Sequence, residues 1–245
     1  MKIFLAGATG AIGRRLIPLL LQAGHHVAGT TRSSDKVDAL RGSGAEPIVV
    51  DVFDARALSQ ALSRARPDIV IDQLTDLPRG LDPSKMAEGT KRNARIRSEG
   101  TQNLVSAMLE SGVRRLVTQS IGWMYAPGPE PHSEGDPLDL QASGPRAITV
   151  AGVATLERLT ATSQGIEGVV LRYGHLYGPN TGTDTVPEAP SLHVDAAASA
   201  ALLAIGKAQS KIYNISEPCD YLSIEKARRE LDFDPSFRLN PLSRS

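Results

Sequence analysis

Residues 2–13 constrain the possible folds of this chain more than any other stretch. Residues 3–6 form a short apolar run that is typical of a buried strand. Gly7, Gly10 and Gly13 follow at three-residue spacing, and an apolar pattern of helical period begins directly after them. In such a strand–turn–helix unit, the first glycine permits the tight turn, the second lets backbone approach a pyrophosphate, and the third lets helix and sheet pack closely. The stretch therefore predicts a dinucleotide site at the N-terminus of the first helix.

The order of the apolar segments predicts an α/β fold. Strands and helices alternate along the chain, which is typical of a parallel sheet covered by helices on both faces. Strands are expected at residues 3–6, 26–30, 46–50, 68–74, 115–119, 168–172 and 211–214. Helices are expected from residue 12 onward and at residues 37–41, 55–65, 92–111, 146–163, 194–206 and 224–231.

These elements make a Rossmann-type, doubly wound parallel sheet the expected fold class. We expect a dinucleotide-binding domain over residues 1–175 and a small, shortened C-terminal substrate-binding region over residues 176–245. The last strand and helix of that region are expected to return to the core.

Composition excludes several classes of partner. The 245 residues carry 27 Lys and Arg against 27 Asp and Glu, so a nucleic-acid or membrane-surface partner is not expected. The single cysteine, Cys219, excludes an internal disulfide and a cysteine-cluster metal site, and no metal is expected. A strand begins at the N-terminus and no long apolar span follows, which predicts a cytoplasmic protein without a signal peptide. The expected partner is a small-molecule substrate.

The residues after the second expected strand bear on the choice of cofactor. An acidic residue there accepts hydrogen bonds from the adenosine ribose, whereas a basic residue accommodates a 2′-phosphate. The sequence reads Thr31-Arg32-Ser33-Ser34, and no acid occurs until Asp35. Arg32 beside a hydroxyl therefore favours NADP over NAD, although a solvated arginine at a helix start is the plainer alternative.

Six motifs in sequence order carry a resemblance to a known family: Gly7-x-x-Gly10-x-x-Gly13, Asp51-Val52, Glu99-Gly100-Thr101-Gln102-Asn103-Leu104, Thr118-Gln119-Ser120, Arg172-Tyr173-Gly174-His175-Leu176-Tyr177-Gly178-Pro179 and His193-Val194-Asp195. Together they resemble the extended short-chain dehydrogenase/reductase family, which includes NAD(P)-dependent epimerases and dehydratases. The resemblance covers nearly the whole chain. It implies a cofactor site that, with the glycine motif and Arg32, comprises Gly7, Thr9, Gly10, Ala11, Ile12, Gly13, Arg32, Ser33, Asp51, Val52, Leu74, Thr75, Ser120, Tyr173, Gly174 and His175.

The chain departs from this family where the chemistry is usually done. The family's Tyr-x-x-x-Lys pair falls on Thr149 and Val153, and no Tyr or Lys occurs between residues 141 and 164. Ser120 matches the family's serine only with a one-residue shift, and Arg97 stands where the family often has asparagine. The candidate catalytic residues are therefore Ser120, Tyr125 and Thr149, with Tyr125 as the first substitute for the missing proton donor.

The segment 126–145 is polar and rich in Pro and Gly, which predicts a lid or substrate loop. It contains His132 near Glu130, Glu134 and Asp136, a group that could bind a cation; a solvated acidic loop is the favoured interpretation. The C-terminal region is short for a sugar-nucleotide site, which favours a smaller substrate.

Three functions remain open from the sequence. The first is an atypical, NADP-preferring oxidoreductase or epimerase-like enzyme acting on a small carbonyl or alcohol. The second is a non-catalytic NADP(H)-binding regulatory protein, and the third is a lyase, isomerase or cyclase that reuses the fold without net redox chemistry. The family resemblance also suggests a homodimer that pairs the helices at residues 92–111 and 146–163.

Overall fold

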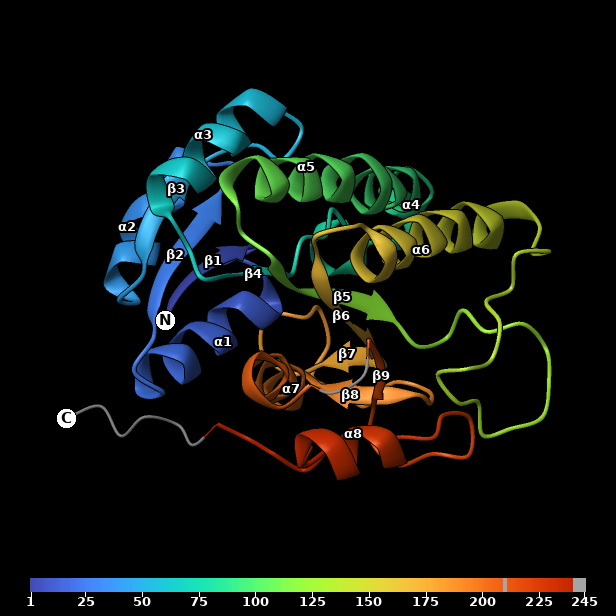
Figure 1. Ribbon diagram of the computed structural model, residues 1–245. Helices are drawn as coiled ribbons and strands as arrows, with labels where there is room; N and C mark the ends of the chain where they lie inside the picture. The colour runs from blue at the N-terminus through green and yellow to red at the C-terminus, as the bar shows by residue number, and fades with distance from the viewer. Residues whose placement is uncertain (209–210, 240–245) are drawn as a thin grey trace.

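The computed structural model describes residues 1–208 and 211–239, apart from the side chain of residue 79 (Figure 1). Within that part of the chain, parallel strands form one seven-stranded sheet in the order β3-β2-β1-β4-β5-β6-β9. The strands are β1 (Lys2–Ala6), β2 (His26–Thr31), β3 (Glu46–Val49), β4 (Ile69–Asp72), β5 (Arg115–Ile121), β6 (Glu167–Tyr173) and β9 (Ile212–Ile215). The order reverses between β1 and β4, and ligands bind at such a reversal in open α/β sheets. The predicted Rossmann-type fold is confirmed.

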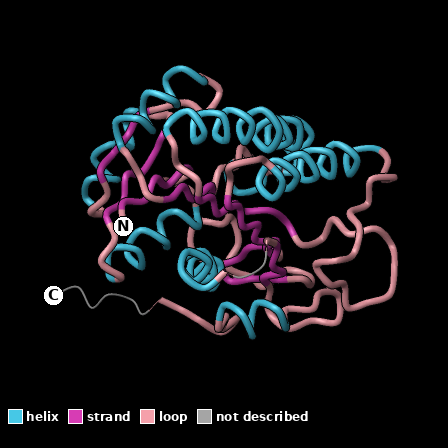
Figure 2. Tube along the Cα trace, in the orientation of Figure 1, coloured by secondary structure: helices cyan, strands magenta, loops and turns pink. Residues whose placement is uncertain are grey.

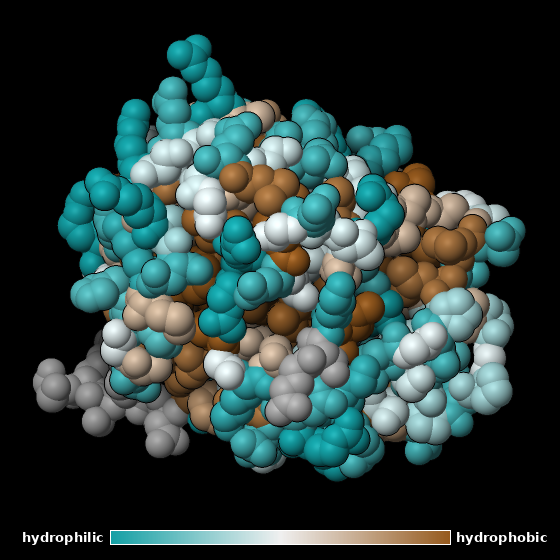
Figure 3. Space-filling view, viewed as in Figure 1, coloured by the Kyte–Doolittle hydropathy of each residue, from teal (hydrophilic) through white to brown (hydrophobic). Residues whose placement is uncertain are grey.

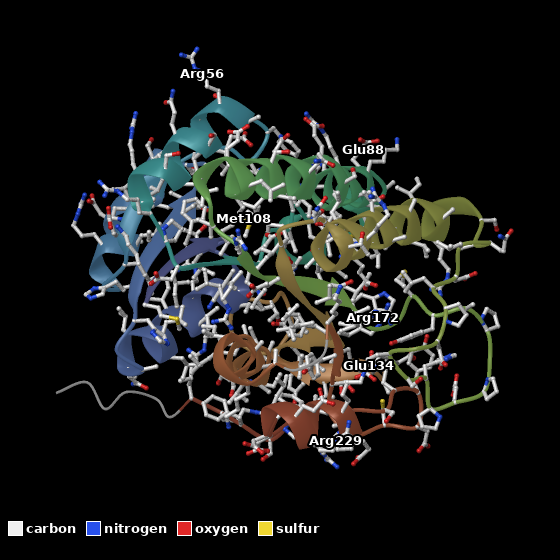
Figure 4. All side chains as sticks on the ribbon, in the orientation of Figure 1. Arg56, Glu88, Met108, Glu134, Arg172 and Arg229 are labelled. Carbon is white, nitrogen blue, oxygen red and sulfur yellow. The ribbon has the colours of Figure 1, made fainter. Side chains whose placement is uncertain are left out.

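Helices cover both faces of the sheet (Figures 1 and 2). One apolar core joins the sheet to α1 (Ala11–Gln22), α2 (Val37–Gly42), α7 (Val194–Lys207) and α8 (Glu225–Leu231). A second core, on the opposite face, includes residues of α3 (Ala55–Ala65), α5 (Thr101–Ser111) and α6 (Gly144–Thr162). In Figure 4, Met108 lies between α5 and the sheet, whereas Arg56 and Arg229 point outward. The two cores thus cover the two faces of the sheet.

Local sequence explains where several elements begin and end. The first helix buries Ile12, Leu16, Ile17 and Leu20, the apolar side chains that its 3.6-residue period brings to one face. Asp54 caps α3 by accepting a hydrogen bond from the backbone N–H of Ala57. These short-range signals are the reason why most elements lie within one or two residues of the predicted bounds.

Three parts of the chain differ from expectation. The segment expected as one helix at 92–111 begins earlier, as α4 (Met86–Arg95), and passes through a π-helical turn, η4 (Ile96–Gly100), before α5. A small parallel sheet of β7 (His175–Tyr177) and β8 (Ser191–His193) was not expected. Short 3₁₀ turns, η1 (Ser34–Lys36), η2 (Arg79–Leu81) and η3 (Pro83–Lys85), lie outside the expected strands and helices. Each is a short or irregular element, for which sequence periodicity carries little signal.

The region after residue 175 contributes to both sheets. It contains β7, β8 and α7, and then β9, which pairs in parallel with β6 at the edge of the main sheet. β9 thus extends the main sheet and α8 packs on its core, while the division into two domains at residue 175 stays a prediction.

The distribution of apolar residues on the surface is relevant to the partners considered from the sequence, a membrane or a second copy of the chain. On the face in Figure 3 most residues are hydrophilic, and apolar ones show over the N-terminal end of α6, near which Leu140 and Ile148 are exposed. Among the described residues, no helix is both long and apolar enough to cross a bilayer. The homodimer stays a prediction.

Asp72, at the end of β4, predicts a pH dependence of stability. The side chain is 3% exposed, its Oδ1 accepts a hydrogen bond from Leu74 N at 3.0 Å, and burial raises its pKa to about 6. Since an unfolded aspartate has a pKa of about 3.9, the folded protein binds the extra proton between the two values. Stability is therefore expected to fall as pH rises from about 4 to 6, by roughly 3 kcal/mol at 1.36 kcal/mol per pKa unit.

In Asp72→Asn this fall should disappear from urea-denaturation curves measured between pH 4 and 7. The exposed control Asp38→Asn should keep it. A fall that persists in Asp72→Asn would assign the pH dependence to other groups.

Candidate functional site

Two adjoining cavities lie at the ends of the strands that flank the reversal point. The smaller is lined by residues that follow β1, β2, β3 and β4. The larger, of about 570 Å³, is lined by the start of α1, by residues after β4, β5 and β6, and by parts of the segments 77–86 and 180–187. Gly10, Gln73 and Thr75 border both cavities. Together they form a continuous site of the size used for small ligands and cofactors.

The glycine turn has the geometry of a pyrophosphate cradle. Gly7 has a φ of 81°, and a Cβ there would lie 2.5 Å from the carbonyl oxygen of Gln73. A Cβ at Gly13 would run into the carbonyl oxygen of Gly7. Helix α1 begins at Ala11 without a side-chain cap or an acidic residue in its first turn. Its backbone N–H groups and positive dipole end are therefore available to an anion, and the residues present fit a dinucleotide.

The smaller cavity has an apolar wall and a basic edge. Val52, Phe53, Leu74 and Ile96 contribute apolar side chains, and Asp51 lies among them. At the edge, Arg32 Nη2 pairs with Asp76 Oδ1 at 3.1 Å, and this contact holds the pKa of Asp76 below its usual range.

A second arginine shares that carboxylate, because Arg92 Nε lies 3.5 Å from Asp76 Oδ2. Lys36 also lines the cavity. The edge thus carries three cations, Arg32, Lys36 and Arg92, against two acids, Asp76 and the nearby Asp51. Sequence reasoning missed Lys36, which a search for further basic residues just past Arg32 could have found.

Most of the predicted cofactor residues line one of the two cavities. Those that do are Gly7, Thr9, Gly10, Ala11, Ile12, Arg32, Asp51, Val52, Leu74, Thr75, Ser120, Tyr173, Gly174 and His175. Gly13 lies behind the turn, where its role is close packing. Ser33 lies outside both linings, because its hydroxyl turns away and donates a hydrogen bond to Asp35.

The proposed proton donor Tyr125 is not brought to the cavity. The residue is 2% exposed, its hydroxyl donates to Asn214 Oδ1 at 2.6 Å, and Arg172 Nη1 donates to it at 2.7 Å. Burial raises the pKa of Tyr125 to about 12, which makes the phenol a weaker acid. This position does not support Tyr125 as the proton donor.

Ser120 and Thr149 do line the larger cavity. The hydroxyl of Ser120 donates to Glu157 Oε1 at 2.7 Å. Glu157 also receives two hydrogen bonds from Arg172, from Nε to Oε1 at 2.9 Å and from Nη2 to Oε2 at 2.6 Å. Val153 is fully buried in an apolar cluster. Where the resembled family has its acid–base pair, the cavity therefore offers a threonine on α6 and, across from it on β5, the engaged hydroxyl of Ser120.

The segment expected as a lid packs elsewhere. Residues 124–143 are absent from the lining of the larger cavity in the described structure, and Glu134 lies near Arg172 in Figure 4. His132 is 3% exposed and stacks on Tyr125, with ring centroids 4.9 Å apart. Glu134 accepts a hydrogen bond from Asn214 N at 2.9 Å and pairs with Lys226 Nζ at 3.3 Å.

The expectation of a solvated acidic loop is thus wrong for His132 and Glu134, because β9 and the turn before α8 bury them. Among the described residues, no group of three His, Cys, Asp or Glu side chains is placed to hold a metal ion.

Three cavity residues were not picked out as functional from the sequence. Trp123 stacks on His175 with ring centroids 3.8 Å apart. Gln73 lies beside the Tyr173 hydroxyl, yet neither polar atom of its buried amide makes a hydrogen bond of ordinary geometry. Arg97 is 7% exposed and lines the cavity from the π-helical turn. Of the three, only Arg97 could have been found from the sequence, because it stands where the resembled family often has asparagine.

The Glu157–Arg172 pair predicts a large stability effect. Replacing Glu157 by Gln leaves the buried Arg172 without its counter-charge, which should lower the free energy of unfolding by about 3–5 kcal/mol. The control Glu99→Gln removes an exposed pair with Arg95 and should cost about 0.5 kcal/mol or less. Urea denaturation of both variants measures the difference, and equal, small losses would contradict the structural role of the buried pair.

Comparisons with known proteins agree with this geometry. Residues 3–191 match the model of the NAD dependent epimerase/dehydratase family. A 3-diazoavenalumate denitrifying reductase from Streptomyces sp. is 45% identical over 185 residues, which are 74% of this chain and 58% of that protein. A UDP-glucose 4-epimerase from Mycolicibacterium smegmatis is 30% identical over 159 residues, covering 62% of this chain and 49% of that one. The chain thus spans only about half the length of these curated relatives.

Solved structures share the fold. The UDP-glucose 4-epimerase of Thermotoga maritima with UDP-glucose superposes with a TM-score of 0.76 at 19% identity, over 97% of this chain and 94% of that one. The UDP-glucose 4-epimerase of Thermus thermophilus in complex with NAD gives 0.75 at 21% identity, over 98% and 95%. The motifs, the glycine cradle and the family match agree, and the chain therefore belongs to the NAD dependent epimerase/dehydratase family, for which an NAD(P) cofactor is typical.

Proposed function

We propose that this protein is an NADP(H)-dependent reductase for a small electrophile whose reduction needs no proton from a protein side chain. The observation that carries the proposal is the combination of an intact dinucleotide cleft with a cavity that lacks an acid–base pair. The first feature supports hydride chemistry. The second argues against the usual carbonyl–alcohol interconversion of the family.

The residues that would hold the cofactor are assigned by their place in the two cavities. The turn at Gly7 and Gly10 would receive the pyrophosphate, and Asp51 and Val52 would contact the adenosine. At the junction with the larger cavity, the strand end at Tyr173, Gly174 and His175 would border the nicotinamide.

The basic edge supports NADP over NAD. A 2′-phosphate there would be contacted by Arg32 and Lys36, which line the smaller cavity. Arg32 can leave Asp76 for a phosphate, because Arg92 also pairs with the Asp76 carboxylate and can neutralise it. NAD has an uncharged 2′-hydroxyl at this position, so it would not pair with the excess positive charge of the edge.

A bound nicotinamide cofactor supplies a hydride, that is, two electrons and no additional proton. Carbonyl reduction also consumes a proton, for which Thr149 is a poor source at neutral pH. The Ser120 hydroxyl already donates to Glu157, and the Tyr173 hydroxyl donates to the backbone oxygen of Ala197 at 3.2 Å. His175 stacks on Trp123, and burial lowers its pKa, which makes it a less available proton source at neutral pH. These positions favour a substrate that accepts hydride alone.

Replacement of a diazonium group by hydrogen is such a reaction, since R–N₂⁺ and a hydride give R–H and N₂. The Streptomyces relative is a denitrifying reductase of a diazo compound. Its 45% identity supports a diazo compound as the first substrate class to test on this chain. The regulatory NADP(H)-binding protein and the lyase, isomerase or cyclase remain the competing proposals.

The cofactor assignment predicts a selective loss of affinity. In calorimetric titrations, Arg32→Ala should bind NADPH about tenfold or more weakly, because a hydrogen bond to a charged group contributes roughly 1.5–3 kcal/mol. NADH binding should be unchanged, and the exposed control Arg56→Ala should bind both cofactors as the wild type does. Equal losses for NADPH and NADH would overturn the 2′-phosphate assignment. Failure of every dinucleotide to bind would contradict both the reductase and the regulatory protein.

The hydride assignment predicts the origin of the new hydrogen. With an aryl diazonium carboxylate and NADPH deuterated at C4, the product should carry one deuterium in place of the diazo group, and N₂ should be released. Unlabelled NADPH in D₂O should give unlabelled product. Mass spectrometry measures both.

The competing functions give different results in the same assay. No oxidation of tightly bound NADPH by a panel of diazo and carbonyl compounds would favour the regulatory protein. Turnover without cofactor, to a product of unchanged redox state, would favour the lyase, isomerase or cyclase.

A further inference from the structure

Arg97 is a buried cation that faces the larger cavity. It lies in the π-helical turn η4, and only 7% of it is exposed. Within residues 1–208 and 211–239, its guanidinium makes no hydrogen bond or ion pair, and no carboxylate lines the cavity. π-Helical turns occur frequently at functional sites, since they turn a side chain away from the regular helical register. Arg97 is therefore placed as a donor toward the cavity interior.

The charges around Arg97 do not balance within the protein. Glu157 is the acid that interacts with Arg97, but both of its carboxylate oxygens already accept hydrogen bonds from Arg172, and one also from Ser120. This buried layer thus holds two guanidinium groups and one carboxylate. Burial lowers the pKa of Arg97 to about 10, against the opposing effect of Glu157, so the side chain stays protonated at neutral pH. A buried charge of this kind is costly unless an anion pairs with it.

Neighbouring groups add polar contacts to the same wall. Asn93 lies four residues before Arg97, is 4% exposed and also lines the cavity. Its Oδ1 accepts a hydrogen bond from Asp76 N at 3.0 Å, which leaves its amide N–H groups for other acceptors. Gln73 borders the cavity as well, but the polar atoms of its amide are buried beside the Tyr173 hydroxyl.

The remainder of the larger cavity is largely apolar. Its lining includes the stacked pair of Trp123 and His175, and its mouth carries the exposed side chains of Leu77 and Leu81. An apolar wall with an aromatic ring suits the flat body of a conjugated molecule. The charged end of such a molecule would meet the donors on the polar wall of the cavity, at Arg97.

We propose that Arg97 forms an anion subsite and that the substrate is a small, conjugated carboxylate whose carboxyl group pairs with Arg97. The proposal rests on the proposed reductase function for its reaction, but the subsite itself is a binding property that can be measured without turnover. An arginine and a carboxylate make a bidentate, charge-assisted pair, so the subsite would select acids over their neutral analogues.

Cinnamate and its neutral analogue cinnamamide test this subsite by calorimetry on the protein saturated with NADP. The wild type should bind cinnamate about tenfold or more tightly than cinnamamide. Arg97→Gln should lose the preference for the acid while binding the amide as before, and Arg97→Lys should keep part of it. The exposed control Arg56→Gln should behave as the wild type. Trp123 is the single tryptophan of the chain, so a change in its fluorescence on binding reports that the acid occupies this cavity.

Two results would overturn the subsite: equal affinity of the wild type for the acid and the amide, or an undiminished preference in Arg97→Gln. Thermal unfolding gives a second readout. Removal of an uncompensated buried charge should leave the melting temperature unchanged or raise it, whereas removal of a structural arginine would lower it. Absence of NADPH oxidation with diazo compounds would count against the proposed reaction and leave the acid preference as a separate result.

Discussion

The buried ion pair between Glu157 and Arg172 is the interaction on which the rest of the site depends. It joins α6 to the end of β6 by one bidentate contact between two buried side chains. Buried ions are stable only where their remaining lone pairs and N–H groups are also satisfied. Ser120 and Tyr125 are therefore held by the pair, and Asn214 completes the network by accepting from Tyr125. Three strands and one helix are fixed to each other in this way.

The same network sets the chemistry that the cavity can offer. Two hydroxyl groups that could have replaced the missing tyrosine are engaged, one as a donor to Glu157 and one in a contact with Arg172. The single carboxylate of the layer is saturated by Arg172, which leaves Arg97 without a counter-charge. A hydride acceptor with its own negative end matches both conditions: it takes no proton from the wall, and it supplies the charge that the wall lacks.

The sequence predicted what local patterns determine. The glycine turn, the start of α1 and the alternation of strands with helices follow from residues a few positions apart, so they were predicted closely. The assignment of Tyr125 depends on partners 47 and 89 residues away, which no local pattern reveals. The burial of Glu134 likewise depends on distant residues, because it contacts Lys226 and the backbone of β9. Ser33 follows Arg32 in the sequence, but its hydroxyl is turned toward Asp35, and this rotamer places it outside both cavities.

The shared border of the two cavities also limits what the substrate can be. A dinucleotide that spans from the smaller cavity past Gly10 and Thr75 would occupy part of the larger cavity with its nicotinamide end. The space left lies between Trp123, Arg97 and the segments 77–86 and 180–187. A nucleotide-sugar would need that space and a further phosphate site, for which Arg97 is the one permanently charged lining residue in the described chain. A single carboxylate on a flat body needs one cation and one apolar wall, and this cavity provides both.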